Sequence, residues 1–453
     1  MDESIFKKYD IRGVYPEQIN EQAVYKICFG FLEFVKDFYN LENPKIVIGY
    51  DIRESSPALK QAGINALIDG GAEVIDIGLC STPLNYFANW SLKADASIMI
   101  TASHNPKQYN GIKFSLKDVV GPVEIGVMDR IKELALKGDF QKNGAGKLVQ
   151  QDMLNEYISF LKEKLNGVDL SNFKIAVDCG NGMIGPEFQR FANELGFEYK
   201  GLFMEPDSSF PNHEPNPLDK EAIKPLQELM SEEKFDLGVI FDGDGDRLGV
   251  LNSRGELIKN DFLIGVFAQY FAMGLKNKKI VSDARLSRGV KEQIEKLGGE
   301  VLKSPVGYPN VRQRMRKDGC FFGGELSGHF FWQDFSYVES ALLSLVRLLK
   351  ILKQVEYSLE ELIKPFSRYF GSGEINFEIE NKEEKIREIE KNYQDGKISH
   401  LDGLTVEYPD WWFNLRMSGT EPLIRLTVEA NTKELFNEKI KELTKIINEA
   451  GPR

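Results

Sequence analysis

Short apolar runs that end in a polar or acidic residue alternate with stretches of helical spacing along most of this chain. The run 45–50 ends at Asp51, and a helical stretch from Ser56 to Gly70 follows it. The Ser-Pro pair at its start predicts Ser56 as the N-cap residue, because proline is favoured in the first helical turn. The run 72–77 comes next. Alternating strands and helices predict mixed or parallel sheets with helices on both faces.

The same order of strand, helix and strand occurs three times, so we predict three diverged α/β units. A second copy starts at 174–178 and a third at 279–283. Each copy contains an unusual loop that follows an apolar run: TASHNP (101–106), DGDGDR (242–247) and GGELSGH (323–329). In α/β folds, ligands bind at loops that leave the carboxyl ends of strands. We therefore expect the three loops to turn toward one cleft.

The pattern changes after Pro365. We expect strands at 375–380, 404–408, 412–415 and 423–428, and helices at 382–391 and 432–449. This mixture predicts a smaller α+β domain behind a linker at 364–373. The predicted α/β domains are 1–148, 149–252 and 253–366, and the predicted α+β domain is 367–453.

Composition narrows the class of protein. The 453 residues are 42% hydrophobic and 28% charged, as in an ordinary soluble globular chain. The formal net charge of −12 argues against a nucleic-acid or anionic-membrane partner. The four cysteines form no CxxC pair, which argues against a zinc site or a disulfide scaffold. The N-terminus lacks an apolar signal region, and no apolar run has membrane-spanning length. We therefore expect a cytoplasmic protein.

Ser103 stands in the TASHNP loop, shortly after the apolar run 96–100. A hydroxyl on a rigid strand end, with the imidazole of His104 beside it, is a candidate nucleophile. A plain turn is the competing interpretation, in which the Ser103 hydroxyl bonds local backbone groups.

Asp242, Asp244 and Asp246 alternate with glycine after the run 237–241. Three carboxylates on a backbone that is free to wrap suit a hard divalent cation such as Mg²⁺. The loop is not an EF-hand, because Ser253 rather than a glutamate occupies the twelfth position. An acidic turn is the competing interpretation. It is disfavoured because three like charges at the end of a buried strand repel one another without a cation.

The RMSGTEP segment is a candidate anion site. Its S-x-x-E spacing also fits a capping box, but Pro422 and the alternating run 423–428 argue against a helix there. Without a helix, backbone N–H groups, the hydroxyls of Ser418 and Thr420 and the Arg416 guanidinium are available to hold an anion.

Glu325, Ser327 and His329 belong to a glycine-rich loop and mix acceptors with donors, which suits sugar hydroxyls. A common Gly-Gly turn with a structural histidine is the competing interpretation, just as Arg285 and Lys113 can be ordinary solvated residues. Together, a hydroxyl nucleophile, a metal loop, a hydroxyl-binding loop and an anion site fit phosphoryl transfer on a phosphorylated sugar.

The segments TASHNP, DGDGDR, GGELSGH and RMSGTEP, in this order, resemble the motifs of the α-D-phosphohexomutase family, specifically its phosphomannomutase/phosphoglucomutase branch. The resemblance covers essentially the whole chain. The opening FKKYDIRG (6–13) also resembles the hexose branch. The phosphoglucosamine branch typically opens with a sequence similar to FGTDGIRG and carries Gln in place of Leu326.

This resemblance implies four domains around a central cleft, three of them similar α/β units. It implies that Ser103 is carried as phosphoserine. It places Mg²⁺ on Ser103, Asp242, Asp244 and Asp246. It implies catalytic roles for Ser103, Lys113, Arg12, Arg247 and His104. It assigns sugar contacts to Glu325, Ser327, His329 and Tyr308. It assigns phosphate contacts to Arg416, Ser418, Gly419, Thr420, Arg425, Arg285 and Tyr9.

The implied enzyme is an isomerase, an intramolecular phosphotransferase that interconverts hexose 1-phosphate and hexose 6-phosphate of mannose, glucose or both. Phospho-Ser103 gives its phosphoryl group to the free hydroxyl, the bisphosphorylated sugar turns over, and Ser103 takes back the other phosphate. Hexose 1,6-bisphosphate is the implied activator and intermediate, and we expect a monomer or small homo-oligomer. The alternatives are a phosphoglucosamine mutase, a non-catalytic sugar-phosphate-binding relative, and a metal-dependent phosphatase, which would normally use an Asp nucleophile.

Two residues depart from the family pattern. Many relatives have a Gly-His pair where this chain has Gly307-Tyr308, and tyrosine is a poorer general base at neutral pH. We therefore expect Lys113 in the proton-transfer role and His104 in a positioning role. Met417 stands where Pro or Ser is commoner, which is expected to change loop stiffness only.

Overall fold

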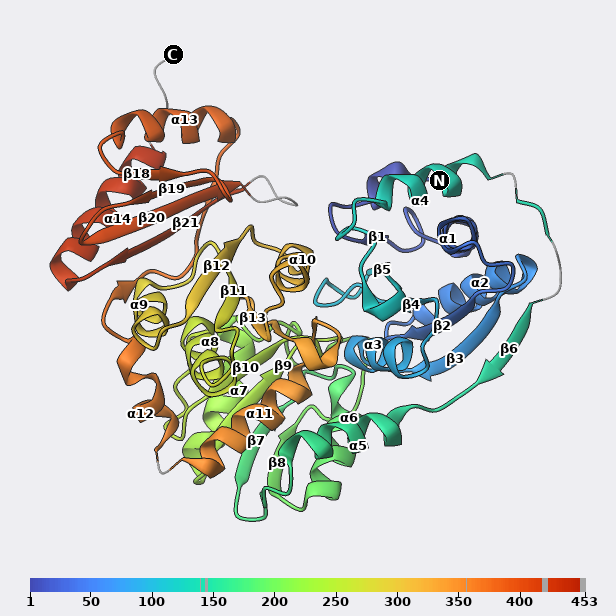
Figure 1. Cartoon of the computed structure of the whole chain (residues 1–453), viewed down its shortest axis with the longest axis horizontal. Coiled ribbons are helices and arrows are strands. Elements are labelled where there is room, and N and C mark those ends of the chain that lie inside the picture. The colour runs from blue at the N-terminus through green and yellow to red at the C-terminus, as the bar shows by residue number, and fades with distance from the viewer. Residues whose placement is uncertain (139, 143–145, 356, 418–422, 449–453) are drawn as a thin grey trace. The chain divides into compact units, whose positions relative to one another are not determined.

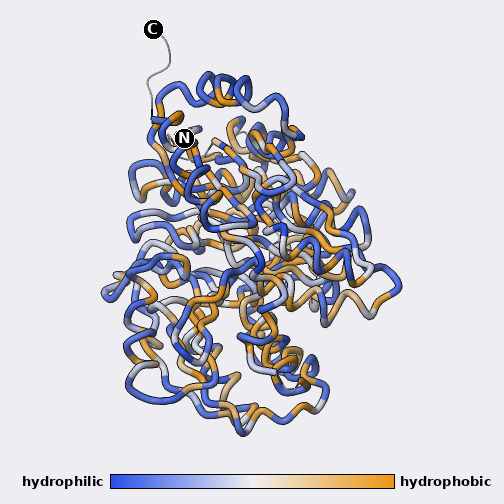
Figure 2. Tube along the Cα trace, turned by 90° about the vertical axis from the view of Figure 1, so that its left-hand side faces the viewer, coloured by the Kyte–Doolittle hydropathy of each residue, from blue (hydrophilic) through white to orange (hydrophobic). Residues whose placement is uncertain are grey.

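The computed structural model describes residues 1–138, 140–142, 146–355, 357–417 and 423–448 (Figure 1). The chain forms two compact units, the first of Met1–Ile258 with Ser327–Glu356 and the second of Lys259–Leu326 with Tyr357–Arg453. Hydrophobic and hydrophilic stretches alternate along the trace of the chain (Figure 2), as strands and helices with one buried side require.

The α-helices are α1 (Glu21–Tyr39), α2 (Ser56–Asp69), α3 (Thr82–Ser91), α4 (Met128–Lys137), α5 (Leu154–Leu165), α6 (Ile184–Leu195), α7 (Lys220–Glu232), α8 (Asn260–Phe267), α9 (Arg288–Lys296), α10 (Tyr308–Asp318), α11 (Ala341–Gln354), α12 (Leu359–Ile363), α13 (Lys382–Asn392) and α14 (Lys433–Asn448). Short helical segments are η1 (Glu3–Ile5), η2 (Lys117–Val119), η3 (Ala268–Ala272), η4 (Gln333–Phe335) and η5 (Lys364–Phe366).

The strands are β1 (Ile11–Val14), β2 (Lys45–Tyr50), β3 (Glu73–Leu79), β4 (Ala96–Ile100), β5 (Tyr109–Leu116), β6 (Lys147–Gln150), β7 (Lys174–Asp178), β8 (Glu198–Leu202), β9 (Leu237–Phe241), β10 (Leu248–Leu251), β11 (Lys279–Asp283), β12 (Glu300–Ser304), β13 (Phe322–Gly324), β14 (Phe330–Trp332), β15 (Val338–Glu339), β16 (Phe370–Gly371), β17 (Ile375–Glu378), β18 (Lys397–Ser399), β19 (Leu404–Glu407), β20 (Trp411–Met417) and β21 (Leu423–Ala430).

The first sheet has six strands in the order β1-β5-β4-β2-β3-β6. Strands β4, β2, β3 and β6 run parallel, while β1 and β5 are antiparallel to their neighbours. Ile46 and Ile48 of β2 pack into the core that α1 and α2 form with this sheet. Val47 points to the opposite face, because successive side chains of a strand alternate, and it is buried as well. Both faces of the sheet are therefore covered, which explains the continuous apolar runs in the sequence.

The second sheet, also in the first unit, has four strands in the order β10-β9-β7-β8. Strands β9, β7 and β8 are parallel, and β10 is antiparallel to β9. Helix α7 packs on β7 and β9, where its residues Ile223 and Leu226 bury Ala176 and Ile240. The first unit also contains the antiparallel pair β14 and β15, and α11, which packs on α5.

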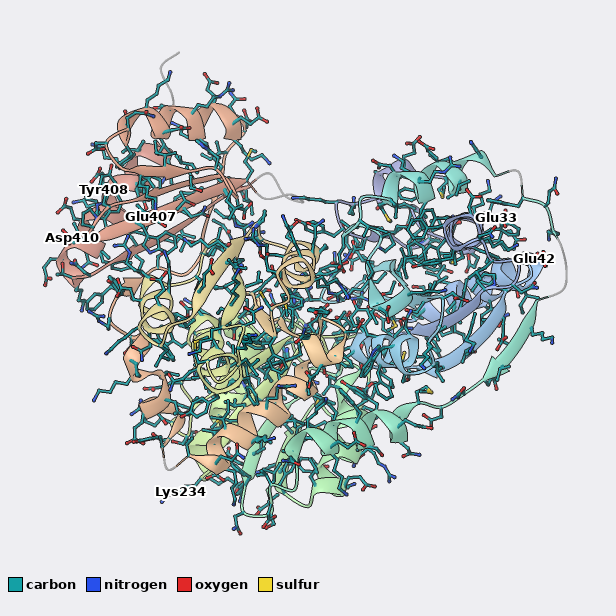
Figure 3. All side chains as sticks on the ribbon, in the orientation of Figure 1. Glu33, Glu42, Lys234, Glu407, Tyr408 and Asp410 are labelled. Atoms are coloured by element: carbon teal, nitrogen blue, oxygen red, sulfur yellow. The ribbon has the colours of Figure 1, made fainter. Side chains whose placement is uncertain are left out.

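In the second unit, β12, β11 and β13 are parallel neighbours, with α9 against β12 and α10 against β11 and β13. The C-terminal sheet is antiparallel, in the order β16-β21-β20-β19-β18, and β17 also pairs with β21. Helix α14 packs on β21 and α13 on β20, over a core that contains Trp411 and Phe413. Glu407, Tyr408 and Asp410 lie together where the chain turns from β19 into β20 (Figure 3).

The predicted fold class is confirmed: three α/β domains precede a smaller C-terminal α+β domain. The TASHNP loop follows β4, the DGDGDR loop follows β9, and GGELSGH begins in β13, as the repeat predicts. The predicted N-cap of α2 was wrong, because the N-cap residue is Ser55. The Ser56 hydroxyl instead donates to the buried carboxylate of Asp51, at 2.7 Å from Oδ1. No helix in the described part of the chain combines the length and apolarity needed to cross a membrane.

Candidate active site

Ser103 lies in the loop between β4 and β5 and is only 3% exposed. Its backbone has a φ of +53°, in the left-handed region that few non-glycine residues adopt. The Ser103 N–H donates to Thr101 Oγ1 at 2.9 Å, and the Ser103 hydroxyl oxygen lies 3.3 Å from His104 Nδ1. A residue stays in such a conformation only where its surroundings hold it there.

Arg53 stabilises this conformation by donating hydrogen bonds to the backbone carbonyls of the loop. It is 1% exposed, and its Nη2 donates to the carbonyl oxygens of Ser103 and Asn105, both at 2.7 Å. Its Nη1 donates to those of Pro106 at 2.8 Å and Tyr109 at 3.0 Å. The rigid, planar guanidinium is suited to bind several fixed acceptors at once. Arg53 therefore fixes the backbone that carries Ser103.

Asp51, directly after β2, orients Arg53. Its carboxylate accepts hydrogen bonds from the N–H of Arg53 at 3.1 Å and from Nε at 3.2 Å. The same spacing recurs after β11, where Asp283 accepts from the N–H and Nε of Arg285 at 2.9 and 3.0 Å. An Asp-x-Arg pair at a strand end is therefore shared by the first and third α/β domains.

Asp242, Asp244 and Asp246 follow β9 and are buried. Each offers a carboxylate oxygen, and these oxygens lie within 4.8 Å of one another. Among the described residues, neither Oδ2 of Asp242 nor Oδ1 of Asp244 has a hydrogen-bond partner. Buried carboxylate oxygens without donors are unfavourable unless a cation binds them. The cluster is therefore able to hold a metal ion, and its oxygen donors suit a hard divalent cation.

The three carboxyl groups differ in their tendency to ionise because their neighbours differ. Burial, with the charges of Asp246 and Asp244, raises the pKa of Asp242 well above its usual range. Burial also opposes ionisation of Asp246, but Lys113 and His329 outweigh it and hold the pKa of Asp246 well below its usual range. Burial and the charge of Asp246 also oppose ionisation of Asp244, but Lys113 and the Thr82 hydroxyl outweigh them and lower the pKa of Asp244. Repulsion within the cluster thus falls mainly on Asp242.

Lys113 on β5 is the main counter-ion of the cluster. Its Nζ lies 2.7 Å from Asp244 Oδ2 and 2.8 Å from Asp246 Oδ2. Burial opposes its charge, but the two carboxylates outweigh burial and raise the pKa of Lys113 well above its usual range. Lys113 is therefore protonated at neutral pH. Thr82, the first residue of α3, donates a hydrogen bond of 2.6 Å from its hydroxyl to Asp244 Oδ2.

The aspartate loop and the Ser103 loop touch through their backbones. A Cβ added at Gly243 would lie 3.0 Å from the carbonyl oxygen of Ser103. Gly182, before α6, approaches the aspartate loop from another segment, since a Cβ there would lie 2.8 Å from the carbonyl oxygen of Gly243. Only glycine allows such an approach. The nucleophile candidate and the metal-type cluster therefore form one buried site in the first unit.

Positive charge gathers around Ser103. Arg12 Nη1 donates to a carbonyl of the Ser103 loop at 3.1 Å, and Arg247 Nε lies 3.2 Å from His329 Nε2. The charge of Arg247, followed by burial and the charge of Arg12, lowers the pKa of His104 well below its usual range. His104 is therefore neutral at neutral pH, which suits a positioning role.

His329 connects to the aspartate cluster within the first unit. Its Nε2 lies 3.1 Å from Asp246 Oδ1, and its Nδ1 lies 3.0 Å from Ser327 Oγ. Ser327 and His329, two residues with predicted sugar contacts, are thus held in one polar network with a candidate metal ligand.

In the second unit, Glu325 and Tyr308 lie close together. Glu325 is buried, and its Oε1 accepts a hydrogen bond of 2.6 Å from the N–H of Gly307, the residue before Tyr308 and α10. The carboxylate of Asp283 accepts from the Leu326 N–H at 3.0 Å, which ties the segment after β13 to the end of β11. Two further residues with predicted sugar contacts are therefore neighbours.

Arg285, Arg416 and Arg425, all predicted to contact phosphate, converge on Glu374 in the second unit. Arg285 Nη1 and Arg425 Nη1 each lie 2.9 Å from the Glu374 carboxylate, and Arg416 Nη2 lies 2.5 Å from it. Converging guanidinium groups are well suited to bind an anion with several oxygens. The other predicted phosphate contacts of this hairpin, Ser418, Gly419 and Thr420, lie outside the described residues.

The structure thus brings the predicted residues together in two groups. The first unit holds Ser103, His104, Lys113, Arg12, Arg247, Ser327, His329 and the three aspartates. The second unit holds Glu325, Tyr308, Arg285, Arg416 and Arg425. Tyr9 stands in the first unit before β1, with Lys8 Nζ 4.9 Å from its ring centroid.

Sequence reasoning missed Arg53, Thr82 and Glu374. The available signal for Arg53 was the Asp-x-Arg spacing that it shares with Arg285. Thr82 and Glu374 have no such signal, because their partners are distant in the sequence: Thr82 binds Asp244, and Glu374 binds Arg285.

Comparisons with known proteins identify the family of this chain. Residues 3–142, 155–255 and 259–369 match the phosphoglucomutase/phosphomannomutase alpha/beta/alpha domains I, II and III, and residues 374–446 match the C-terminal domain of the same proteins. The chain is 36% identical to a phosphomannomutase of Methanocaldococcus jannaschii over 98% of both chains.

Two solved structures show the same fold. A phosphoglucomutase/phosphomannomutase family protein from Burkholderia thailandensis has a TM-score of 0.88 and 30% identity, over 99% of this chain and 98% of that chain. The N-acetylphosphoglucosamine mutase of Aspergillus fumigatus, solved with GlcNAc-6P and magnesium, has a TM-score of 0.58 and 16% identity, over 92% of this chain and 85% of that chain.

The four domains, together with the buried serine and aspartate site, define a phosphohexomutase, an isomerase that acts as an intramolecular phosphotransferase. The chain belongs to the phosphoglucomutase/phosphomannomutase family. The family and the class of enzyme predicted from the motifs are therefore confirmed.

Proposed function

We propose that this phosphohexomutase interconverts the 1-phosphates and 6-phosphates of mannose, glucose or both, through a phosphoserine at Ser103. The observation that carries the proposal is the contact between the Ser103 loop and the buried aspartate cluster. A phosphoserine adds about −1.5 to −2 charges. Such a group beside three carboxylates requires a cation and nearby basic side chains, which this site is built to provide.

Mg²⁺ is the proposed metal, with Asp242, Asp244, Asp246 and phospho-Ser103 as its ligands. Asp242 Oδ2 and Asp244 Oδ1, which have no donor among the described residues, fit this role. When bound, Mg²⁺ supplies positive charge that neutralises the oxygens of the phosphoryl group. Thr82 and Lys113 hold the Asp244 carboxylate in place.

In the first transfer, the free hydroxyl oxygen of the hexose 1-phosphate attacks the phosphorus of phospho-Ser103, and the bond from phosphorus to Ser103 Oγ breaks. Lys113 is the proposed proton donor to the leaving Oγ, and it regains a proton from the attacking hydroxyl. Arg12 and Arg247 stabilise charge on the phosphoryl group as it moves. His104 positions the Ser103 hydroxyl.

The product of this step is hexose 1,6-bisphosphate, the proposed intermediate and activator. After it turns over, the hydroxyl oxygen of Ser103 attacks the phosphorus at position 1, and the bond from that phosphorus to the sugar oxygen O1 breaks. Lys113 gives a proton to O1 and regains one from the Ser103 hydroxyl, so hexose 6-phosphate leaves and phospho-Ser103 is restored. The proposed contacts of the non-transferred phosphate are Arg416, Ser418, Gly419, Thr420, Arg425, Arg285 and Tyr9. The proposed contacts of the sugar hydroxyls are Glu325, Ser327, His329 and Tyr308.

Two alternatives remain distinct from this proposal. A phosphoglucosamine mutase is disfavoured by the YDIRG opening and by Leu326. A non-catalytic sugar-phosphate-binding protein is disfavoured because Ser103 and the three aspartates are all present. We further propose a cytoplasmic enzyme that works as a monomer or small homo-oligomer, with domain limits at 148/149, 252/253 and 366/367.

A coupled assay tests the proposal. The full chain is supplied with Mg²⁺, a trace of the matching hexose 1,6-bisphosphate, and glucose, mannose or glucosamine 1-phosphate in turn. We expect 6-phosphate formation from glucose or mannose 1-phosphate and little from glucosamine 1-phosphate. A higher kcat/KM for glucosamine 1-phosphate would replace the proposal by the phosphoglucosamine alternative.

Ser103→Ala is the matched variant for this assay. It removes only the hydroxyl oxygen, so we expect hexose phosphates still to bind while turnover falls to background. Full turnover by this variant would exclude the phosphoserine mechanism. Binding without turnover by the unaltered chain would instead support the non-catalytic alternative.

A further inference from the structure

Glu374 lies at the centre of the arginine group in the second unit. Its Oε2 lies 2.9 Å from Arg285 Nη1 and 2.5 Å from Arg416 Nη2, and its Oε1 lies 2.9 Å from Arg425 Nη1. One carboxylate therefore engages three guanidinium groups from the third α/β domain and from both strands of the β20–β21 hairpin.

The backbone around Glu374 is fixed. Ser372 N–H donates to the carbonyl of Val428 at 3.0 Å, and Val428 N–H donates back to Ser372 Oγ at 2.9 Å. Gly373 follows with a φ of +66°, which turns the chain toward the carboxylate position and which a residue with a side chain rarely adopts. These contacts fix the backbone next to Glu374 against β21.

The group around Glu374 retains capacity for an anion. Arg416 is 8% exposed, and its Nε has no hydrogen-bond partner among the described residues. Burial opposes the charge of Glu374, but Arg285 and Arg416 outweigh burial and lower its pKa, so the carboxylate is ionised at neutral pH. A carboxylate and a phosphate present the same kind of paired oxygens to a guanidinium group.

We propose that Glu374 is a resident counter-ion that competes with the substrate's phosphate for Arg285, Arg416 and Arg425. The proposal rests on the assignment of these arginines to phosphate binding in the proposed function. Without an anion, the buried Arg285 and Arg416 and the half-buried Arg425 would repel one another, and Glu374 offsets this repulsion. When a phosphate binds the arginines, Glu374 gives up contacts with them or repels the phosphate, so it weakens binding in either case.

This competition serves the two-step reaction. The bisphosphorylated sugar must release one phosphate from the arginine group and return with the other. A carboxylate that pairs with the vacated arginines lowers the free energy of the released state, and release becomes faster at a cost in affinity. Glu374 is thus a positioning residue that acts through the arginines and sets the balance between holding and releasing the phosphate.

Glu374→Gln tests the proposal, because it keeps the shape of the side chain and removes its charge. We expect the Kd of the full chain for glucose 6-phosphate to fall by about two- to fivefold, the upper part of the range for one charge pair. We expect KM for the hexose 1-phosphate to fall as well, while kcat falls or stays level. A residue needed only for folding would instead weaken binding and raise KM.

Two control variants sharpen the result. Glu378→Gln removes the same charge from an exposed position at the end of β17, and its Kd should stay at the unaltered value. Glu374→Asp keeps the charge and should remain closer to the unaltered chain than to Glu374→Gln. Equal or weaker binding of glucose 6-phosphate by Glu374→Gln than by the unaltered chain overturns the proposal.

Calorimetric titration with inorganic phosphate separates this proposal from the proposed function. If the unaltered chain binds phosphate but does not isomerise hexose phosphates, the mutase function fails. The ratio of the Kd for phosphate of Glu374→Gln to that of the unaltered chain still decides the role of Glu374. If the chain isomerises hexose phosphates but Glu374→Gln binds phosphate no more tightly, the mutase function stands and the role of Glu374 is refuted.

Discussion

Arg53 Nη2 donates a hydrogen bond of 2.7 Å to the carbonyl oxygen of Ser103. The contact joins the end of β2 to the loop after β4, and the same guanidinium binds three more carbonyls of that loop. Because Ser103 has a φ of +53°, its backbone needs such support to keep the hydroxyl in one place. Arg53 thus fixes the position from which Ser103 is proposed to react, although Arg53 is not predicted to touch the substrate.

Arg53→Lys should separate this positioning role from simple charge. A lysine keeps the positive charge but lacks the planar fork, so it leaves some of the four carbonyls without a donor. We expect the free energy of unfolding to fall by about 2–4 kcal/mol and kcat to fall at least about tenfold, with a smaller change in KM. Urea unfolding and the coupled assay measure the two effects.

Arg130→Lys is the matched control for Arg53→Lys. Arg130 lies on α4 with a side chain that is 48% exposed, and its ion pair among the described residues is with Glu133 at 3.3 Å, so its replacement should change neither quantity. If Arg53→Lys keeps full kcat while the loss of stability is measurable, Arg53 serves the fold alone.

Asp244→Asn should abolish the response of the protein to Mg²⁺. A ligand that binds only the folded state stabilises it, by about 2.7 kcal/mol at a hundredfold excess over Kd. We therefore expect the unaltered chain to gain Tm with Mg²⁺ and to lose the gain with chelator, and the variant to show neither change. Thermal unfolding with and without Mg²⁺ measures this independently of activity.

Asp129→Asn on the exposed start of α4 removes the same charge without touching the cluster, and it should respond to Mg²⁺ as the unaltered chain does. An equal gain of Tm in Asp244→Asn would show that the metal binds elsewhere.

Glu187 makes the stability of the first unit depend on pH. Burial raises its pKa to about 7, although the N–H and hydroxyl of Ser81 donate to its carboxylate and act in the opposite direction. The folded protein therefore keeps this proton up to higher pH than the unfolded chain does. The contribution of Glu187 to the free energy of unfolding is therefore largest below the ordinary pKa of a glutamate. It falls as the pH rises toward 7 and is constant above that, for a total loss of about 3 kcal/mol.

Glu187→Gln resembles the protonated group at every pH, so it should remove this dependence. Its amide oxygen can accept from the Ser81 N–H, and its NH₂ can donate to the Ser81 hydroxyl oxygen. We expect the variant to match the unaltered chain near pH 4 and to exceed it in free energy of unfolding near pH 8. Glu194→Gln, on the outer side of the same helix, should leave the pH dependence as it is. A variant that is less stable than the unaltered chain near pH 8 would contradict the raised pKa.

The parts of the site that lie within a single loop could be predicted from the sequence. Asp242, Asp244 and Asp246 stand at spacing two after an apolar run, so both the cluster and its place after a strand could be predicted. The repeat also placed Ser103 and Glu325 at corresponding loops. Their contacts with the substrate stay predictions, as do the domain limits.

The parts of the site that could not be predicted from the sequence are contacts between segments far apart in the chain. Lys113 was expected as a candidate base, but nothing in the sequence around β5 indicates that its ammonium pairs with Asp244 and Asp246. Similarly, nothing in the sequence distinguishes Glu374 from other charged residues that precede a strand. Its function depends on which guanidinium groups the tertiary fold brings to it, and periodicity along one strand does not contain that information.

Thr82 links the first α/β domain to the aspartate loop and offers a test of how strictly Asp244 must be held. Its hydroxyl donates to Asp244 Oδ2 at 2.6 Å, and its N–H donates to the Asp244 carbonyl oxygen at 2.9 Å. Thr82→Val removes only the first bond, because valine has nearly the same shape and keeps the N–H. A buried carboxylate that loses a donor is less well oriented, and partners of metal ligands typically change metal affinity by about 10- to 100-fold.

We therefore expect Thr82→Val to need about tenfold more Mg²⁺ for half-maximal activity, while kcat at saturating Mg²⁺ recovers most of its original value. The dependence of mutase rate on Mg²⁺ concentration measures both quantities. Thr427→Val, at a buried position of β21 in the second unit, makes the same chemical change away from the aspartate loop and should leave the Mg²⁺ requirement unaltered. An unchanged Mg²⁺ requirement in Thr82→Val would mean that Lys113 alone suffices to orient Asp244.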